Sequence, residues 1–182
     1  MDELERTRAS KLLSRLLRHA PQSAGLTLQP GGWVAVETLI LACRSQGIVL
    51  TRAQIADIVA TSDKQRFALG DNGETIRANQ GHSVPVDLGL VPLEPPAVLF
   101  HGTHPKVLDA ILQEGLKRMQ RHHVHLSQDL ETARKVGSRR GRPVILRVDA
   151  ARMWKAGCLF WKSANGVWLT DVVAPSYLSV TA

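Results

Sequence analysis

The chain has 182 residues, of which 44% are hydrophobic and 21% charged, and its 23 Lys and Arg outnumber its 16 Asp and Glu to give a net charge of +7. This composition is globular and excludes a mostly disordered or fibrous chain. No apolar stretch approaches the ~20 residues of a membrane span, and the first residues lack the features of a secretory signal. We therefore expect a soluble, cytoplasmic protein without membrane contact. Its two cysteines exclude a disulfide framework.

The first predicted helix carries two stripes of side chains. Its apolar residues recur at helical spacing, as shown by Ala9, Leu12, Leu13, Leu16 and Leu17. A basic stripe beside them consists of Arg8, Lys11, Arg15 and Arg18. Pro21 disfavours helical geometry in the residue before it, so the helix is expected to end near Arg18-His19.

The rest of the first ninety residues predicts two more helices and a hairpin. A helix is expected over 36–46, and Thr51 with Gln54 forms a capping box that begins another. Residues 65–69 and 74–79 flank a Gly-Asp-Asn-Gly turn and are expected to pair. Three helices followed by a hairpin is the order of a winged-helix module.

A proline-rich segment at 91–96 predicts a stiff linker between a lobe at 1–90 and a lobe at 97–182. In the second lobe, strand and helix patterns alternate and then end in a run of strands. The overall fold class is therefore predicted to be α+β.

Two details of the second lobe are specific enough to test. We expect a helix capped by Ser127, and a hairpin at Asn165-Gly166 followed by a strand over 171–177.

Most of the excess positive charge lies in the second lobe. Residues 117–142 hold eight Lys or Arg but only two acidic residues. A concentrated basic segment is typical of a site for nucleic acid or a multiply phosphorylated ligand. Because neither G-x-G-x-x-G nor G-x-x-x-x-G-K-S/T occurs, a Rossmann domain or a P-loop is disfavoured.

Three histidines, His122, His123 and His125, raise the question of a metal site. Along a strand, His123 and His125 share one face while His122 points to the other. No nearby cysteine or carboxylate completes a ligand set. We therefore expect no metal, and interpret these histidines as hydrogen-bonding groups of a polar strand or cleft.

Seven blocks of sequence, in order, carry a resemblance to one known family: Lys11–His19, Gly32-Trp33, Asp63–Phe67, Ile76–Ser83, His101–Thr103, His123–Ser127 and Asn165–Thr170. On these blocks the chain resembles the RNA 2′-phosphotransferase family, called KptA in bacteria, over essentially its whole length. The resemblance implies an N-terminal winged-helix RNA-binding lobe followed by a C-terminal ADP-ribosyltransferase-like lobe. We expect the protein to act as a monomer.

The resemblance also implies a reaction. An RNA with an internal 2′-phosphate would be one substrate, and NAD+ would be consumed as the other, without a metal. The RNA 2′-phosphate would first displace nicotinamide from NAD+ to give a 2′-phospho-ADP-ribosylated RNA. The ribose 2″-hydroxyl would then attack that phosphate, releasing 2′-OH RNA and ADP-ribose 1″,2″-cyclic phosphate.

The family's catalytic set of three arginines and a histidine corresponds here to Arg18, His19, Arg66 and Arg121. Guanidinium groups can bracket a phosphate dianion, and a histidine can move a proton on or off an attacking or leaving oxygen. Arg121 is preferred to Arg139 for the fourth place because it lies beside the strand expected to contact NAD+.

The resemblance further implies binding residues. Those for NAD+ are His101, Gly102, Thr103, His125, Ser127 and Arg139. Gly102 would let backbone groups approach the nicotinamide carboxamide, and His101 would hold a ribose hydroxyl. Those for RNA are Lys11, Arg77, Gln80, His82 and Arg140. Where Arg140 stands the family usually has a histidine, so the chain departs from the pattern in this loop.

Two other functions stay open. The first lobe alone would suffice for a winged-helix nucleic-acid binder without catalysis, and an ADP-ribosyltransferase could stop after transfer to a nucleic-acid phosphate. The phosphotransferase reading requires Arg18, His19 and Arg66 to face the NAD+ residues of the second lobe across a cleft. The physiological RNA does not follow from the sequence.

Overall fold

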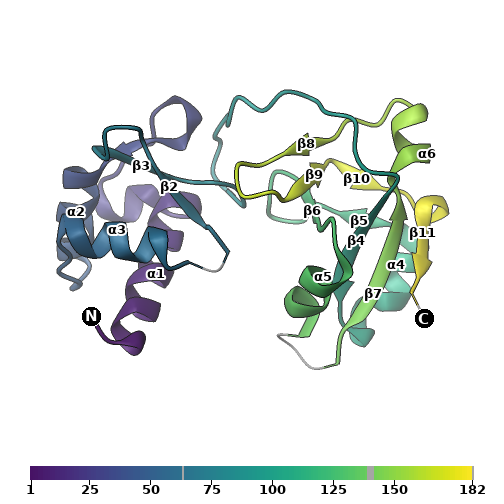
Figure 1. The fold of residues 1–182 in the computed structure, drawn as a ribbon, viewed down its shortest axis with the longest axis horizontal. Helices are drawn as coiled ribbons and strands as arrows, with labels where there is room; N and C mark the ends of the chain where they lie inside the picture. The colour runs from purple at the N-terminus through teal and green to yellow at the C-terminus, as the bar shows by residue number, and fades with distance from the viewer. Residues whose placement is uncertain (63, 139–141, 182) are drawn as a thin grey trace. The chain divides into compact units, whose positions relative to one another are not determined.

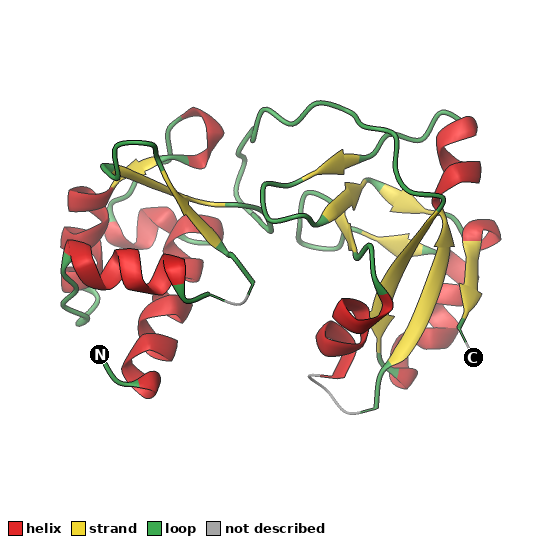
Figure 2. Cartoon of the chain, in the orientation of Figure 1, coloured by secondary structure: helices red, strands yellow, loops and turns green. Residues whose placement is uncertain are grey.

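The computed structural model describes residues 1–62, 64–138 and 142–181. The chain divides into two compact units, Met1–Gly89 and Leu90–Ala182, each with its own hydrophobic core. Both units combine helices with antiparallel sheet, so the predicted α+β class is confirmed (Figures 1 and 2). In these described ranges, no helix is both long and apolar enough to cross a membrane.

Three helices build the first unit: α1 (Glu3–Arg18), α2 (Val36–Ser45) and α3 (Arg52–Ala60). The helix α1 ends at the predicted residue, and a short 3-10 turn at Pro21–Ala24 follows it. The predicted capping box of α3 is also confirmed, because the Thr51 side chain accepts from the Gln54 N–H while the Gln54 side chain accepts from the Thr51 N–H.

The first unit also holds a three-stranded antiparallel sheet in the order β1-β3-β2. The predicted hairpin is confirmed as β2 (Phe67–Leu69) paired with β3 (Thr75–Ala78). A two-residue strand that the sequence did not predict, β1 (Val34–Ala35), pairs with the other edge of β3. The buried leucines of α1 pack with α2, α3 and this sheet in one core (Figure 1).

The second unit consists of two three-stranded antiparallel sheets, β11-β7-β4 and β6-β9-β8, and a small pair of strands. The first sheet contains β4 (Val98–Thr103), β7 (Val144–Asp149) and β11 (Leu178–Val180). The second contains β6 (Val124–Leu126), β8 (Trp161–Lys162) and β9 (Trp168–Thr170). The small pair is β5 (Leu116–Lys117) with β10 (Val172–Val173).

The core of the second unit draws buried side chains from both large sheets. Leu99 and Leu146 contribute from one sheet, and Leu126 and Trp168 from the other. Because side chains alternate along a strand, Leu99, His101 and Thr103 share the inner face of β4, while Gly102 lies on its outer face. The helices of this unit are α4 (Leu108–Glu114), α5 (Leu130–Gly137) and α6 (Ala150–Lys155), and α5 packs against β4 and β7 (Figure 1).

Two local predictions for the second unit are wrong. Ser127 does not cap a helix, because it forms a two-way backbone bridge with Phe100, and Asp129 instead accepts from the Thr132 N–H at 2.7 Å as the N-cap of α5. The expected strand over 171–177 is only the two-residue β10, followed by a 3-10 turn at Pro175–Tyr177. The predicted Asn165-Gly166 hairpin does form, between β8 and β9.

The segment predicted as a stiff linker is attached to the second unit. The Leu93 N–H donates to the Phe160 carbonyl at 2.8 Å, and Pro95 is buried. The boundary between the two units falls just before this segment, between Gly89 and Leu90.

Candidate functional site

Arg18, His19 and Arg66 lie in one neighbourhood of the first unit. Arg18 is the last residue of α1, and its Nη2 donates to the Arg66 carbonyl oxygen at 3.1 Å. Its guanidinium carbon lies 5.9 Å from the centroid of the Phe67 ring, in the strand that follows Arg66. The helix end thus meets the start of β2, which places two of the predicted catalytic arginines together.

The segment that follows β3 ties this neighbourhood together. Asn79 is buried; its backbone N–H donates to the Arg66 carbonyl at 3.0 Å, and its side-chain Nδ2 donates to the Gln65 carbonyl at 2.6 Å. Gln65 has a φ of 41°, which is uncommon for a residue with a side chain. The Asn79 bond therefore holds an unfavourable backbone conformation next to Arg66.

The same segment holds the end of α1. The Ser83 N–H donates to the Arg18 carbonyl at 2.9 Å, and the Ser83 Oγ lies 2.9 Å from the His19 Nδ1. With Nδ1 engaged in this way, the ring orientation of His19 is set and its Nε2 points away from Ser83. Gly81 lies against the Arg18 guanidinium, since a Cβ added there would be 3.7 Å from Arg18 Nη1.

The side chain of Arg66 also has a nearby partner. Its Nη1 lies 3.4 Å from the Ser62 Oγ, and its backbone N–H lies 3.5 Å from the same oxygen. Ser62, Asn79 and Ser83 contact this neighbourhood but were not predicted as site residues from the sequence. Asn79 and Ser83 stand within a block that carried the family resemblance, which could have pointed to them.

The residues predicted to bind RNA have different surroundings. Lys11 is exposed on α1 and Gln80 is half-buried. Arg77 is half-buried with its guanidinium 4.6 Å from the Trp33 ring centroid, and its Nη1 donates to the Gly31 carbonyl. His82 is only 2% exposed, so it belongs to the interior of the unit rather than to an RNA-facing surface.

In the second unit, His101 and His125 are joined directly. The His101 Nδ1 lies 3.0 Å from the His125 carbonyl oxygen, which can only accept, so Nδ1 carries the proton and Nε2 is an acceptor. The backbone bridge between Phe100 and Ser127 fixes the two strands on which these histidines lie.

Electrostatics favour the neutral form of His101. Burial lowers the pKa of His101 below its ordinary value of 6.5, the positive charge of Arg121 lowers it further, and the bond to the His125 carbonyl partly opposes them. Arg121 is exposed in the turn after β5, and its positive charge contributes least of the three effects on the pKa of His101. A neutral imidazole with a free acceptor nitrogen suits a hydroxyl donor.

Other predicted residues of this unit have structural explanations. Thr103 is buried at the end of β4. A Cβ added to Gly102 would fall on the Ala133 carbonyl oxygen of α5, so the packing of this helix requires glycine there whatever ligand binds. The His123 ring packs against the Trp161 ring at a tilt of 52°, with ring centroids 4.9 Å apart, and burial is the main reason that the pKa of His123 is lowered.

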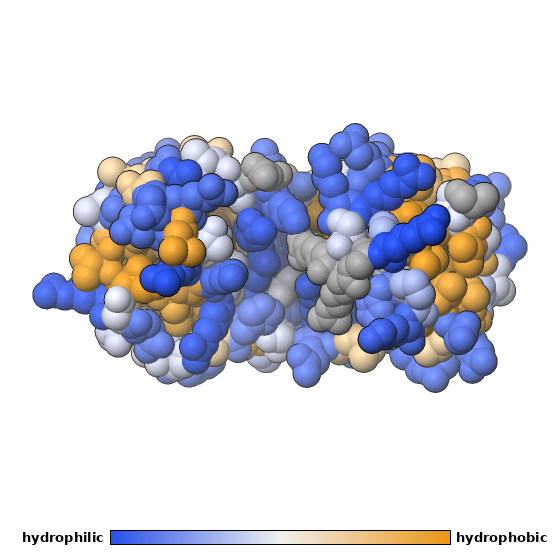
Figure 3. Space-filling model, turned by 90° about the horizontal axis from the view of Figure 1, so that it is seen from below, coloured by the Kyte–Doolittle hydropathy of each residue, from blue (hydrophilic) through white to orange (hydrophobic). Residues whose placement is uncertain are grey.

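Two predicted residues, Arg139 and Arg140, lie outside the described residues. Among the residues that are described, no three His, Cys, Asp or Glu side chains form a group that could hold a metal ion. On the surface of each unit that is visible in Figure 3, hydrophilic side chains surround separate patches of hydrophobic ones.

Known proteins resemble this chain over nearly its full length. A family model described as RNA 2′-phosphotransferase, Tpt1/KptA family, matches residues 4–172. A protein named probable RNA 2′-phosphotransferase from Streptomyces griseus is 54% identical over 98% of both chains. Proteins of the same name from Trichormus variabilis and Agrobacterium fabrum are each 52% identical, over 98% of both chains for the former and over 97% of this chain and 95% of the relative for the latter.

Proposed function

We propose a function from the following premise: this chain belongs to the RNA 2′-phosphotransferase, Tpt1/KptA family. The family makes it a transferase that acts on the 2′-phosphate of RNA. Our proposal is that NAD+ is the acceptor, and that the phosphate leaves RNA in the two steps described below.

The observation that carries the proposal is the hydrogen-bonded cluster around Arg18, His19 and Arg66. Asn79 and Ser83 hold the backbone and side chains of this cluster through the bonds given above. Two guanidinium groups and an imidazole held together suit a phosphate dianion, which needs several charged donors and a group that transfers a proton.

The residues of the second unit fit an NAD+ ribose. Burial favours the neutral form of His101, which offers Nε2 as an acceptor. Thr103 and Ser127 lie on the two segments that the backbone bridge between Phe100 and Ser127 joins. We infer that His101 accepts from a ribose hydroxyl and that Arg121 adds positive charge beside it. Bound there, NAD+ would supply an electrophilic ribose carbon with nicotinamide as leaving group, and a neighbouring 2″-hydroxyl.

In the proposed first step, an oxygen of the RNA 2′-phosphate bonds to the ribose C1″ as the bond to nicotinamide breaks, and nicotinamide leaves with the electron pair. In the second step the 2″-hydroxyl loses its proton and attacks the phosphorus, and the RNA 2′-oxygen leaves and gains a proton. Arg18, Arg66 and Arg121 would stabilise the negative charge that builds on the phosphoryl oxygens. His19 would transfer the proton at the attacking or departing oxygen.

We also propose fold types for the two units. The order α1-β1-α2-α3-β2-β3, with an antiparallel hairpin at the end, supports a winged-helix type for Met1–Gly89. Two antiparallel sheets that share one core, with α5 packed on the outer face of one of them, support an ADP-ribosyltransferase type for Leu90–Ala182.

One incubation tests the proposed function. The protein is mixed with NAD+ and an oligonucleotide carrying one internal 2′-phosphate, and the RNA and nucleotide products are separated and identified. We expect 2′-OH RNA, nicotinamide and ADP-ribose 1″,2″-cyclic phosphate, and none without NAD+. RNA that ends as the ADP-ribosylated species would favour an ADP-ribosyltransferase, and unchanged RNA would favour a nucleic-acid binder.

A further inference from the structure

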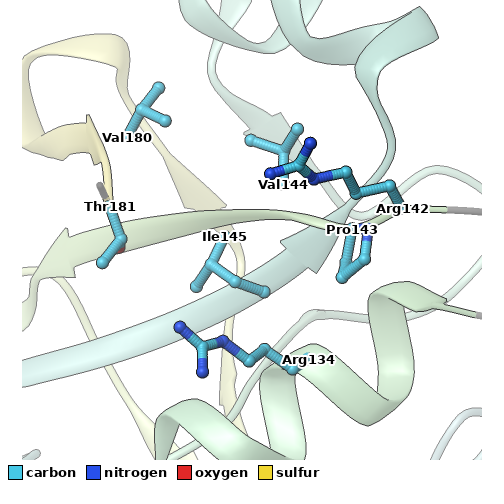
Figure 4. Close-up of a pocket in the computed structure, with 7 residues that line it drawn as sticks. All are labelled: Arg134, Arg142, Pro143, Val144, Ile145, Val180 and Thr181. Carbon is cyan, nitrogen blue, oxygen red and sulfur yellow. The ribbon is translucent and has the colours of Figure 1, made fainter.

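An open cavity of about 410 Å³ lies in the second unit between α5, the start of β7 and the end of β11 (Figure 4). It is lined by Arg134, Arg142, Pro143, Val144, Ile145, Val180 and Thr181. Because Ile145 pairs with Gly102 across the sheet, it lies on the outer face that α5 covers. His101 lies on the opposite, inner face, so the cavity is separate from the residue proposed to hold the NAD+ ribose.

The cavity has two cations that its described surroundings do not neutralise. Neither the Arg134 nor the Arg142 side chain forms an ion pair or hydrogen bond with any residue in the described part of the chain. The neighbouring cation on α5 behaves differently, since Lys135 pairs with Glu131 at 3.0 Å. Two guanidinium groups at one cavity without a carboxylate favour an anion.

The remaining lining suits an ester rather than a free inorganic ion. Pro143, Val144, Ile145 and Val180 give the cavity an apolar wall. The Oγ1 of Thr181 is buried and has no hydrogen-bond partner within the described residues, and the Thr181 N–H is held by the Ile145 carbonyl at 2.9 Å. Figure 4 shows Arg134 extending from α5 toward Ile145 and Thr181.

We propose that this cavity binds a phosphodiester of the RNA backbone outside the reacting nucleotide. Arg134 and Arg142 hold the phosphate oxygens, the Thr181 hydroxyl donates a further hydrogen bond, and the apolar wall contacts the adjoining sugar. The choice of RNA rests on the proposed function and on the position of the cavity on the face away from His101. The chemically similar alternative is the pyrophosphate of NAD+.

The test uses the full chain and a labelled RNA oligonucleotide without a 2′-phosphate, so that no reaction occurs. The dissociation constant is measured against salt concentration for the unsubstituted protein and for Arg134→Gln, Arg142→Gln and their combination. Arg147→Gln is the matched control, since Arg147 is exposed on the same strand β7 and does not line the cavity.

Each cavity substitution should weaken RNA binding about tenfold, as expected for loss of a charged hydrogen bond. Each should also flatten the slope of log K against log salt by about 0.7. Thr181→Val, which keeps the shape but removes the hydroxyl, should weaken binding severalfold without changing the slope. Arg147→Gln should change binding by less than about twofold, as for a cation that makes no phosphate contact.

Three results would overturn the proposal: unmeasurable RNA binding by the unsubstituted protein, effects equal to those of Arg147→Gln, or a loss of NAD+ affinity with unchanged RNA binding. The last would assign the cavity to the NAD+ pyrophosphate. The binding measurement needs no turnover, so it tests the cavity independently of the proposed reaction. The cavity proposal can be wrong while NAD+-dependent removal of the 2′-phosphate still occurs, and RNA can bind at the cavity even if that reaction does not occur.

Discussion

Replacing Asn79 by alanine should damage the Arg18–Arg66 cluster while leaving most of the first unit intact. The Asn79 backbone bond to Arg66 persists in Asn79→Ala, but the 2.6 Å bond from Nδ2 to the Gln65 carbonyl is lost. Leaving a part-buried carbonyl without this donor costs about 1–3 kcal/mol. Gln65 has a φ of 41°, a backbone conformation about 1–2 kcal/mol less favourable than the right-handed one. Without the Asn79 bond Gln65 can leave this conformation, and the relief of strain recovers part of the lost stability.

We therefore expect the free energy of unfolding to fall by about 2 kcal/mol, which lowers the Tm by roughly 10 °C for a unit of this size. Catalysis should be impaired as well as folding. Relaxation of Gln65 moves the Arg66 carbonyl, which is the acceptor for Arg18 Nη2. Loss of that one charged hydrogen bond in the transition state corresponds to a fall in kcat of about tenfold or more.

Thermal unfolding and single-turnover rates at 20 °C, where the variant is still folded, separate these two effects. Asn79→Asp tests the donor itself, since it keeps the shape but replaces the donating group by an acceptor. Asn72→Ala is the control, because Asn72 makes its bonds in the exposed turn of the same hairpin. If Asn79→Ala matches Asn72→Ala in both Tm and rate, the reasoning about Gln65 and Arg66 is refuted.

The remaining predictions concern the second unit and the catalytic set. Gly102→Ala should lower the free energy of unfolding by about 1–3 kcal/mol or more, because the added methyl group collides with the Ala133 carbonyl, and urea denaturation measures this loss. Unchanged stability with weakened NAD+ binding would instead mean that Gly102 is required only for ligand binding. The pKa of His101 in the folded protein lies below its unfolded value near 6.5, so the unfolded state binds more protons as the pH drops from 7 through 6.5. The free energy of unfolding should therefore fall over that range, and urea midpoints for His101→Gln should lack this decline. In the proposed reaction, charge builds on the phosphate mainly in the second step, so alanine variants of the proposed catalytic set should accumulate ADP-ribosylated RNA in rapid-quench experiments. Equal loss of this species and of product would contradict the proposed division of roles. That set is Arg18, His19, Arg66 and Arg121.

The sequence by itself determined the features that depend on neighbours a few residues apart. The end of α1 at Arg18-His19 follows from its apolar periodicity and from Pro21, and the start of α3 follows from the capping box of Thr51 and Gln54. The turn between β2 and β3 was predictable for the same reason. These signals are local, because a helix cap or a tight turn satisfies its hydrogen bonds within one or two turns of chain.

Strand pairing between distant segments was decided only by the tertiary structure. The strands β1, β5 and β10 have two residues each, too few for a period-two pattern, and each exists because a partner elsewhere in the chain supplies its hydrogen bonds. Ser127 shows the same effect, since its local sequence suits a helix cap but its backbone bonds go to Phe100.

The organisation of the candidate site also depended on the tertiary structure. The sequence singled out Arg18, His19 and Arg66 as residue types suited to phosphate chemistry, but it did not indicate that Asn79 and Ser83 hold them. Asparagine and serine are common in loops, and only the folded chain brings their side chains to the Gln65 carbonyl and the His19 ring. The sequence therefore predicts which residue types can act on a phosphate. The hydrogen bonds that orient their side chains join positions 14 and 64 residues apart and exist only after folding.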